Sequence, residues 1–434
     1  VLGSIEARYY LSNILLLPLK QTAFWISPHP VSAYIFSPTL ASSWPNIYIS
    51  QHKRPPHYCL NLGMSLLMNA NGSGHAFEPS RLQQKVNLPP EFLWPEGDLE
   101  NDNLGELNEP LIDLDGSKAE AVELIRAACS KHGFFQVRNH GVDADLIRAA
   151  HEEADSIFKL SLAKKHDIRR KPGAVVGYSG AHADRFSSKL PWKETFSFKY
   201  HENEDEGKDD VVVDYFISAL GDDFEQTGKV YQRYCGAMKK VAMTVFELLG
   251  MSLGVDGHHY RKFYEDGSSI MRFNYYPICN NSNFTLGTGP HCDPNALTIL
   301  HQDQVGGLQV FADNKWRNVR PRPDSLVINI GDTFTASSNG MYKSCLHRAV
   351  VNKDKERRSL VFFVCPREDK VVRPPQDLLR QGPRKYPDFT WSHLLDFTQN
   401  HYRADVATLH SFIPWLLSSQ TFGVPLDPPL RYSA

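Results

Sequence analysis

The sequence has almost no excess of charge of either sign, since 47 Lys and Arg residues stand against 49 Asp and Glu residues in a chain of 434. Nucleic-acid binding needs basic residues clustered on one face, and this balance gives no sign of them. The chain also lacks an apolar run of about 20 residues, the length that spans a membrane as a helix. We therefore expect neither a nucleic-acid partner nor a membrane span.

Cysteine is present seven times, but no two cysteines form a C-x-x-C pair. An odd and scattered set of this kind is typical of free thiols in a reducing compartment, and it argues against a disulfide framework or a zinc cluster. A dinucleotide-binding fingerprint is missing as well, because no G-x-G-x-x-G sequence opens a predicted helix. These absences favour a cytoplasmic protein without a disulfide scaffold.

Residues 1–63 differ in composition from the rest of the chain. They contain one acidic residue, four basic residues and seven prolines, without helical or strand periodicity. We expect this segment to be unstructured or absent from the native protein, because Met64 opens a normal-looking coding segment. Residues 64–108 are predicted to form an N-terminal arm, and its part 72–108, rich in Gly, Pro and acidic residues, is expected to be solvated.

The pattern of residues 109–255 mixes helices and strands. Apolar residues recur at helical spacing in three segments, 118–132, 144–160 and 224–253. A short apolar strand is predicted directly after the first of them, at 134–137. We therefore predict an N-terminal α/β domain over this part of the chain.

The pattern changes in residues 256–405. They contain at least seven short β-rich runs separated by turns, with no helices between the runs. Such a series indicates an antiparallel sandwich or barrel such as a jelly roll, the double-stranded β-helix. We therefore predict a mixed α and β fold, mainly β, in which a jelly-roll core carries the N-terminal α/β domain and flanking helices. Residues 406–434 are predicted to form a C-terminal tail.

A His-x-Asp sequence lies at the start of the β-rich part. In an extended chain, residues i and i+2 project from the same face, so His291 and Asp293 can reach one ion together. His347 lies 56 residues later, at the start of another predicted strand, and it can supply the third ligand on the same side of the metal. Two histidines and one carboxylate leave adjacent positions open on an octahedral metal, as in non-haem Fe(II) oxygenases. The alternative is that both histidines are hydrogen-bonded core residues in a common tripeptide context.

A second group of polar residues follows the same alternation. Arg357 and Ser359 share one face of a strand that begins ten residues after His347. A guanidinium beside a hydroxyl suits a bidentate carboxylate contact, so a dicarboxylic co-substrate would fit there. Asn274 and Tyr276 likewise share one side of the strand that precedes the His-x-Asp sequence. Asn-Tyr-Tyr-Pro could also be only an aromatic strand ended by proline.

Taken in order, these motifs resemble those of a known family. The series Asn-Tyr-Tyr-Pro, His-x-Asp, His and Arg-x-Ser is similar to that of the plant 2-oxoglutarate and Fe(II)-dependent dioxygenases, including the 56-residue and ten-residue gaps. The stretches 110–114 and 133–141 match the N-terminal domain of that family. The resemblance therefore covers about residues 109–400 and does not depend on one tripeptide.

The resemblance implies two groups of binding residues and a set of cofactors. The iron ligands would be His291, Asp293 and His347. The residues at 2-oxoglutarate would be Arg357, Ser359 and Tyr276, with Asn274 in support. Fe(II), 2-oxoglutarate and O2 would be needed for turnover, and ascorbate is expected as the reductant.

Two longer stretches, 190–195 and 287–310, resemble the gibberellin 20-oxidases within this family. That resemblance implies oxidation of a C20 gibberellin at carbon 20, repeated until the carbon is lost and a C19 gibberellin forms. An apolar substrate with carboxylates needs a mostly apolar pocket with one or two cations, for which Trp192 and Lys193 are the candidates. A Pro-Trp turn with an exposed lysine explains the same residues equally well.

Other functions remain open on these residues alone. The chain could be a gibberellin 3- or 2-oxidase, or a flavonoid oxidase. It could also be a non-catalytic scaffold that binds a small acid, although the intact His-Asp-His set argues against that. The expected partner is a small gibberellin, and the expected state is a monomer.

Overall fold

The computed structural model describes residues 77–84, 87–99, 104–171, 173–181, 189–202, 210–401 and 408–421. The expectation that residues 1–63 are unstructured or absent lies outside these residues, as do parts of the predicted arm and of the predicted tail.

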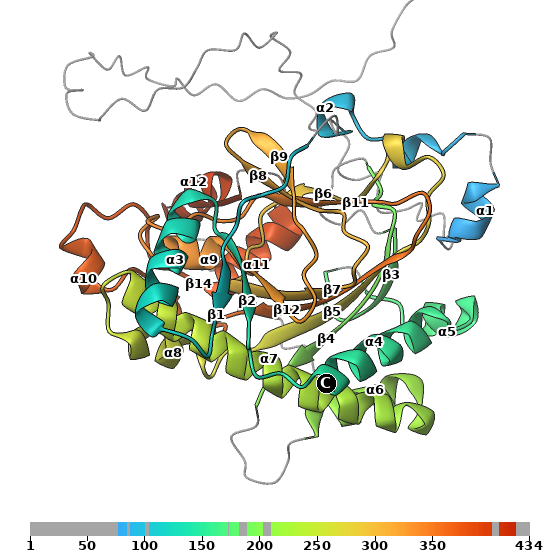
Figure 1. Cartoon of the computed structure of the whole chain (residues 1–434), viewed down its shortest axis with the longest axis horizontal. Coiled ribbons are helices and arrows are strands. Elements are labelled where there is room, and N and C mark those ends of the chain that lie inside the picture. Colours follow the sequence, from blue (N-terminus) through green and yellow to red (C-terminus); the bar gives the residue numbers. More distant parts are fainter. Residues whose placement is uncertain are drawn as a thin grey trace, which may run out of the picture. The chain divides into compact units, whose positions relative to one another are not determined.

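Two β-sheets form the core of the described chain (Figure 1). The strands of the large sheet are β1 (Leu111–Asp113), β2 (Phe134–Arg138), β3 (Gly177–Gly180), β4 (Glu194–Tyr200), β5 (Ser269–Tyr276), β7 (Leu297–Gln302), β10 (Leu326–Ile330) and β12 (Arg357–Val364). Those of the small sheet are β6 (Leu286–His291), β8 (Leu308–Ala312), β9 (Lys315–Asn318) and β11 (His347–Val350). The large sheet has the order β1-β2-β10-β7-β12-β5-β4-β3, and the small sheet has the order β6-β11-β8-β9.

The strands from β5 to β12 alternate between the two sheets, except for the pair β8 and β9, which are neighbours in the small sheet. This alternation is the jelly-roll arrangement, and the predicted mixed α and β fold with a jelly-roll core is confirmed. Strands β1 to β4, from the predicted N-terminal domain, join the same large sheet. The two predicted parts therefore share one sheet, and the boundary at residue 255 stays a prediction.

Both faces of the large sheet are covered, as the sequence of its central strand β12 shows. Leu360 and Phe362 belong to the core that includes the helices, whereas Val361 and Phe363 belong to a second core that includes the small sheet. Because successive residues of a strand point to opposite faces, a strand buried on both sides has a continuous apolar run instead of an alternating one. The face toward the small sheet is the one that carries the candidate site.

Helices cover the other face of the large sheet (Figure 1). They are α3 (Lys118–Lys131), α4 (Ala144–Phe158), α5 (Leu162–Asp167), α6 (Val211–Leu220), α7 (Glu225–Ser252) and α8 (Gly257–Tyr264), with the short η2 (Asp222–Phe224) before α7. The long α7 packs against α3, α4, α6 and α8. Helix α3 begins after the N-cap Ser117 and ends before Gly133, whose φ of +69° and close approach to the carbonyl of Lys343 require glycine. No helix among the described residues is long and apolar enough to cross a membrane.

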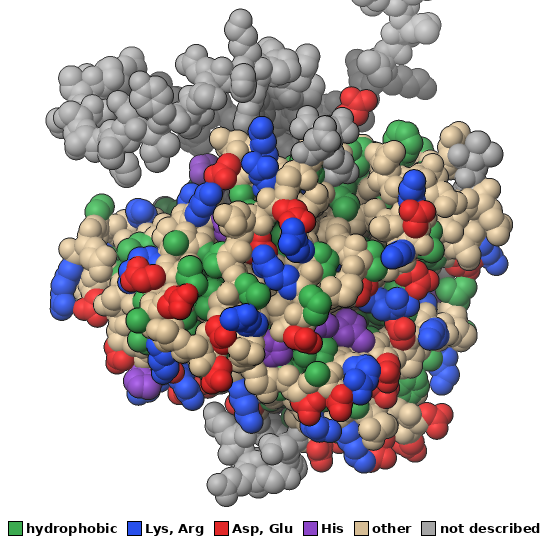
Figure 2. All heavy atoms as spheres, viewed as in Figure 1, with side chains coloured by type: hydrophobic (Ala, Val, Ile, Leu, Met, Phe, Trp, Pro, Cys, Tyr) green, Lys and Arg blue, Asp and Glu red, His purple; other side chains and the backbone are tan. Residues whose placement is uncertain are grey.

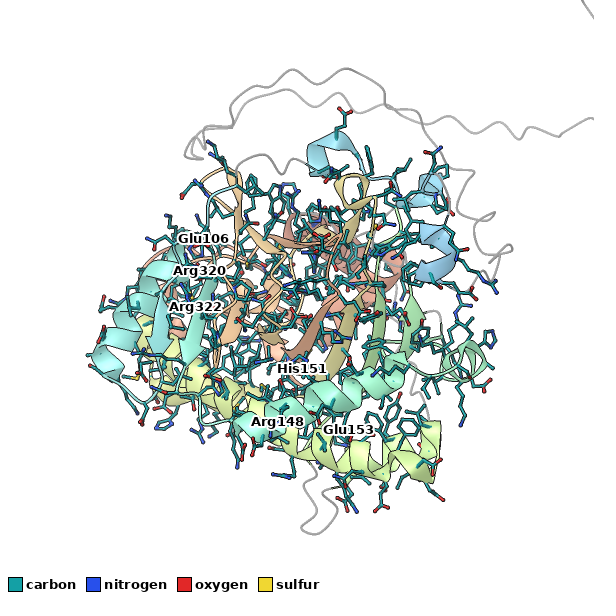
Figure 3. All side chains as sticks on the ribbon, turned by 45° about the vertical axis from the view of Figure 1, so that its right-hand side comes forward. Glu106, Arg148, His151, Glu153, Arg320 and Arg322 are labelled. Atoms are coloured by element: carbon teal, nitrogen blue, oxygen red, sulfur yellow. The ribbon has the colours of Figure 1, made fainter. Side chains whose placement is uncertain are left out.

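The N-terminal arm packs on the jelly roll. It contains α1 (Pro79–Gln83), η1 (Pro90–Phe92) and α2 (Glu96–Leu99), and residues 104–107 run beside β9. Phe77, Phe92 and Trp94 are buried in it, and Arg320 pairs with Glu106 at its end (Figure 3). The expectation of a solvated arm therefore holds for most of its described side chains, which are exposed or half-buried, and is wrong for the scattered aromatic residues, which are buried.

The C-terminal part forms a core of its own. Its elements are β13 (Val371–Val372), α10 (Gln376–Leu379), β14 (Phe389–Thr390), α11 (Trp391–Asp396), the π-helix η4 (Phe397–His401) and α12 (Thr408–Thr421). Ala336 of α9 (Asp332–Ser337), which follows β10, belongs to the same core, whereas the short η3 (Ser282–Phe284) lies between β5 and β6. Phe412 and Leu416 of α12 are fully buried against Phe389 and Trp391. The predicted tail 406–434 thus contains a packed helix, and its residues 422–434 lie outside the described chain.

Charges of both signs are interspersed over the described surface on the face that Figure 2 shows. This mixture agrees with the near-zero net charge of the sequence.

Candidate metal centre

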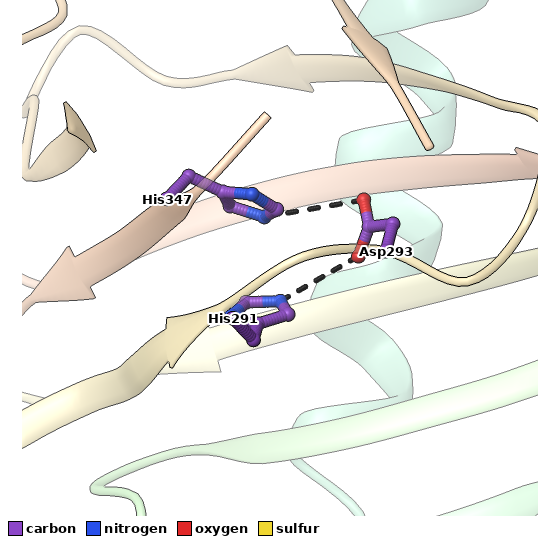
Figure 4. A group of neighbouring side chains, drawn as sticks. All are labelled: His291, Asp293 and His347. Atoms are coloured by element: carbon purple, nitrogen blue, oxygen red, sulfur yellow. Dashed lines mark ion pairs between the residues drawn. The ribbon is translucent and has the colours of Figure 1, made fainter. Parts of the chain in front are cut away.

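Three side chains that are far apart in the sequence meet between the two sheets (Figure 4). His291 is the last residue of β6, His347 is the first residue of β11, and the antiparallel pairing of these strands places the two residues opposite each other. Nε2 of His291 is 3.5 Å from Oδ1 of Asp293, and Nε2 of His347 is 3.9 Å from Oδ2. The structure therefore brings together the three residues that the sequence analysis selected as metal ligands.

Hydrogen bonds to the main chain orient both imidazole rings. Nδ1 of His291 is 2.9 Å from the carbonyl oxygen of Gly289, and Nδ1 of His347 is 3.0 Å from that of Cys345. A carbonyl oxygen only accepts, so in the neutral ring Nδ1 carries the proton and the Nε2 lone pair faces Asp293. Two neutral imidazole nitrogens and one carboxylate oxygen are a donor set that fits Fe(II).

The Asp293 carboxylate is fixed by a second hydrogen bond. Thr298 Oγ1 donates to Asp293 Oδ2 at 2.7 Å, and Asn295 Nδ2 donates to Thr298 Oγ1 at 3.1 Å and to the carbonyl of Leu297 at 2.7 Å. These residues orient the carboxylate before any metal binds.

Burial and the ligand charges set the ionisation of the site. Burial, together with the neighbouring His347, lowers the pKa of His291 to about 4, so that its ring is neutral near pH 7. Burial alone would raise the pKa of Asp293, but the two histidines and the Thr298 hydroxyl outweigh it and hold that pKa well below its usual value. Neutral rings with an ionised carboxylate are the forms that bind a divalent cation.

A second polar cluster lies on the inner face of the large sheet, which is the face toward the small sheet. Its residues, which we call the co-substrate cluster, are Asn274, Tyr276, Gln302, Arg357 and Ser359. The strand register places Asn274, Ser359 and Gln302 side by side on β5, β12 and β7, and it places Tyr276 opposite Arg357. Asn274 Nδ2 donates to Ser359 Oγ at 3.2 Å, and Arg357 Nη2 donates to Gln302 Oε1 at 3.0 Å. The Arg357 guanidinium also lies 4.9 Å from the centre of the Tyr276 ring.

This cluster has polar atoms that the protein leaves without hydrogen bonds. Arg357 is 2% exposed, yet its Nε has no hydrogen-bond partner, and neither does Nε2 of the buried Gln302. Buried donors of this kind are normally satisfied, so their presence indicates an acceptor that comes with a ligand. A carboxylate would satisfy the donors and neutralise the guanidinium, which fits the distal end of 2-oxoglutarate.

Comparisons with known proteins agree with this geometry. The model described as 2OG-Fe(II) oxygenase superfamily matches residues 267–366, and the model described as non-haem dioxygenase in morphine synthesis N-terminal matches residues 110–214. Gibberellin 20 oxidase 2 of Arabidopsis thaliana is 53% identical over 346 residues, which cover 79% of this chain and 91% of that protein. The chain belongs to the 2OG-Fe(II) oxygenase superfamily.

Further relatives of this oxygenase come from a second plant and from a solved structure. Gibberellin 20 oxidase 2 of Oryza sativa subsp. indica is 56% identical over 342 residues, with 77% of this chain and 87% of that protein covered. The crystal structure of JOX2 in complex with 2OG, Fe and JA is 29% identical with a TM-score of 0.68, and it covers 77% of this chain and 96% of its own.

Two residues of the oxygenase site were not found by sequence reasoning: Gln302 and Thr298. Both lie on β7, which is buried on both faces, so no polar alternation marks the strand as a whole. Thr298, Leu300 and Gln302 nevertheless point to one side by the i, i+2 rule, and this spacing could have suggested the two polar residues.

The two residues that sequence analysis placed at the substrate have different surroundings. Trp192 is fully buried, and its indole donates to the carbonyl of Pro277 at 3.2 Å. Its ring packs edge to face with the rings of Phe77 and Phe92, at centroid distances of 5.3 and 5.5 Å. Lys193 is half-buried, and its Nζ donates to Thr288 Oγ1 at 2.9 Å. A contact of either residue with a gibberellin stays a prediction.

The outer face of the same strands carries structural contacts. Arg358 pairs with Asp155 of α4 and with Glu356, as expected for a residue that points away from Arg357. Nε2 of His151, which points from α4 toward the sheet, lies 2.8 Å from Nδ1 of His301 (Figure 3). These contacts hold α4 against the back of the co-substrate cluster.

Proposed function

We propose that this oxygenase catalyses the 2-oxoglutarate-dependent oxidation of C20 gibberellins at carbon 20, in successive steps that end in loss of that carbon and a C19 gibberellin. The observation that carries the proposal is the 53% to 56% identity to gibberellin 20 oxidases over most of both chains, together with the His291, Asp293 and His347 set between the sheets.

In the proposed mechanism, His291 and His347 would hold the metal through Nε2, and Asp293 would hold it through its carboxylate. Bound Fe(II) would supply the activation of O2, with 2-oxoglutarate as the co-substrate that leaves as succinate and carbon dioxide. The main-chain hydrogen bonds of the two histidines and the Thr298 hydroxyl keep the three donors in place. Three protein ligands would leave the metal accessible to the co-substrate and to O2.

The co-substrate cluster orients 2-oxoglutarate. Arg357 pairs with its distal carboxylate, and the hydroxyls of Ser359 and Tyr276 donate to the same group. Asn274 holds the Ser359 hydroxyl, and Gln302 holds the guanidinium. Because Arg357 and Ser359 are almost fully buried, the carboxylate is removed from water when it binds, which strengthens the charge pair.

The test is turnover by the anaerobically reconstituted Fe(II) enzyme with 2-oxoglutarate and a panel of gibberellins and flavonoids. Succinate should appear with C20 gibberellins, and His347→Ala should abolish it, whereas Lys199→Met, on an exposed lysine of β4, should not. If succinate forms only with another class of gibberellin, or only with a flavonoid, the chain is a different oxidase of the same family. No succinate with any substrate would favour the scaffold. Parallel assays with and without ascorbate test the expected reductant.

The monomeric state and the cytoplasmic location expected from the sequence stay predictions. Light scattering of the purified chain and imaging of a tagged chain in plant cells test them.

A further inference from the structure

We infer that Lys193 is a second cation of the co-substrate site, where it holds Tyr276 through Thr288 and attracts the distal carboxylate of 2-oxoglutarate. The inference rests on the proposed function only in that the site takes 2-oxoglutarate. It gives Lys193 a role at the co-substrate, and the role at the gibberellin that the sequence suggested becomes the competing outcome.

The sheet register places Lys193 in a row with the co-substrate residues. Glu194, the first residue of β4, is opposite Tyr275, and Tyr275 is opposite Arg358. One residue further along, Tyr276 is opposite Arg357, and Lys193, the residue directly before β4, takes the place beside Tyr276 when the register of Glu194 is extended by one residue. Because neighbours in a row share a face of the sheet, these three residues all belong to the inner face.

The next row has the same character. Thr195, Asn274, Ser359 and Gln302 lie side by side on β4, β5, β12 and β7. The inner face therefore carries two adjacent polar rows, and the first of them has a cation on each side of Tyr276.

Hydrogen bonds connect Lys193 to Tyr276. Lys193 Nζ donates to Thr288 Oγ1 at 2.9 Å, and Thr288 Oγ1 is 3.4 Å from the Tyr276 hydroxyl. Thr288 and Tyr276 are buried, at 6% and 4% exposure, so the contacts are shielded from water. Gly287 leaves room for the Tyr276 ring, since a Cβ there would lie 2.5 Å from ring atom Cδ1.

The backbone before Lys193 is firmly held. Trp192 N donates to the carbonyl of Leu286 at 2.9 Å, and its indole donates to that of Pro277. These bonds tie the turn to the start of β6 and to the end of β5. The ammonium is therefore placed by packed structure, which is the condition for a charge to orient a ligand.

A positive charge on each side of Tyr276 has a specific effect on an anion bound there. The attraction between unit charges is strengthened in a buried site. Thr288 donates its proton to the carbonyl of Gly287 at 2.9 Å, so the Tyr276 hydroxyl donates to Thr288 Oγ1 over the longer distance of 3.4 Å and can turn its proton to a bound carboxylate. Loss of the Lys193 charge should thus weaken the binding of an acid that has a distal carboxylate. The binding of the metal-chelating end of that acid should stay the same.

The experiment compares two acids that share the chelating end. Binding of 2-oxoglutarate and of 2-oxobutyrate, which lacks the distal carboxylate, is measured by calorimetry on the Mn(II)-loaded protein. Lys193→Met should weaken 2-oxoglutarate binding about tenfold, or about 1.4 kcal/mol, and leave 2-oxobutyrate binding unchanged. Lys193→Arg should restore most of the affinity. Lys199→Met, which removes an exposed charge from the strand β4 that follows Lys193, should change the binding of neither acid.

Thr288→Val tests the connection without removing the charge. It should lower the affinity for 2-oxoglutarate by less than Lys193→Met does, and it should leave the affinity for 2-oxobutyrate unchanged. If circular dichroism shows that Lys193→Met does not fold, Thr288→Val provides the test. In turnover, the KM for 2-oxoglutarate should rise in both variants while the KM for the gibberellin stays constant.

Three results would overturn the inference: unchanged 2-oxoglutarate affinity in the folded variants, equal losses for both acids, or a rise confined to the KM for the gibberellin. Failure of the proposed function is a separate outcome, because it appears as a wild-type protein that binds 2-oxoglutarate but does not oxidise a C20 gibberellin.

Discussion

Replacing Thr298 by Val should weaken metal binding without changing a metal ligand. Valine keeps the shape of threonine and removes the hydroxyl that donates to Asp293 Oδ2 at 2.7 Å. A hydrogen bond to a charged group contributes about 1.5–3 kcal/mol, and each 1.4 kcal/mol changes an equilibrium constant about tenfold. The expected loss of metal affinity is therefore roughly ten- to a hundredfold. Asn295 loses one acceptor but keeps its bond to the carbonyl of Leu297.

The assay is a titration of the metal-free protein with Mn(II), in which electron paramagnetic resonance measures the concentration of the free ion. Thr298→Ser should bind Mn(II) nearly as well as wild type, because it keeps the donor. Thr227→Val is a matched control, since Thr227 is buried and donates to a carboxylate oxygen of Glu153 at 2.6 Å in the helical layer. It should cost stability but no metal affinity.

Equal Mn(II) affinity in Thr298→Val and wild type would refute the assigned role of the hydroxyl. Equal losses in Thr298→Val and Thr227→Val would also refute it, because the effect would then reflect general destabilisation.

Three further predictions concern the co-substrate cluster and the helical layer. Arg357→Ala should raise the KM for 2-oxoglutarate about a hundredfold or more, because two charge-assisted hydrogen bonds are lost, and steady-state kinetics measures it. Gly287→Ala should displace the Tyr276 ring, raise the same KM and destabilise the fold by about 1–3 kcal/mol, while Mn(II) affinity stays constant. Burial lowers the pKa of His151 to about 4 and that of His301 to about 3. The unfolded chain takes up protons near pH 6.5 and the folded chain does not, so the free energy of unfolding should fall between about pH 6.5 and pH 4, and less so in His301→Gln. Urea denaturation at several pH values measures this, and an unchanged slope in the variant would contradict it.

The metal and co-substrate residues could be selected from the sequence because their spacing follows local geometry. Arg357 and Ser359 obey the i, i+2 rule within β12, and Asp293 follows His291, the last residue of β6, at the same spacing. Only His347 had to come from a neighbouring strand to complete the set of ligands. Its position at the start of a β-rich run indicated such a strand. The strands and the long helices were visible as well, the strands as short β-rich runs between turns and the helices from their period.

The rest depended on contacts between distant segments. Strand β6 was missed because Gly287, Gly289 and Pro290 have low strand propensity, and only pairing with β11 keeps them extended. The burial of Phe77 and Phe92 depends on Trp192, about a hundred residues away. The positions of Gln302 and Lys193 relative to Arg357 follow from register across neighbouring strands, which no single segment encodes.

The proposed activity is tested most directly by following an isotopic label on carbon 20 of a C20 gibberellin during turnover with Fe(II), O2 and 2-oxoglutarate. The label should leave the gibberellin skeleton, with succinate formed at each oxidation and an unlabelled C19 product at the end. A product that is hydroxylated at another carbon, with the label still on an unoxidised carbon 20, would contradict oxidation at carbon 20 and would place the reaction at another position of the substrate.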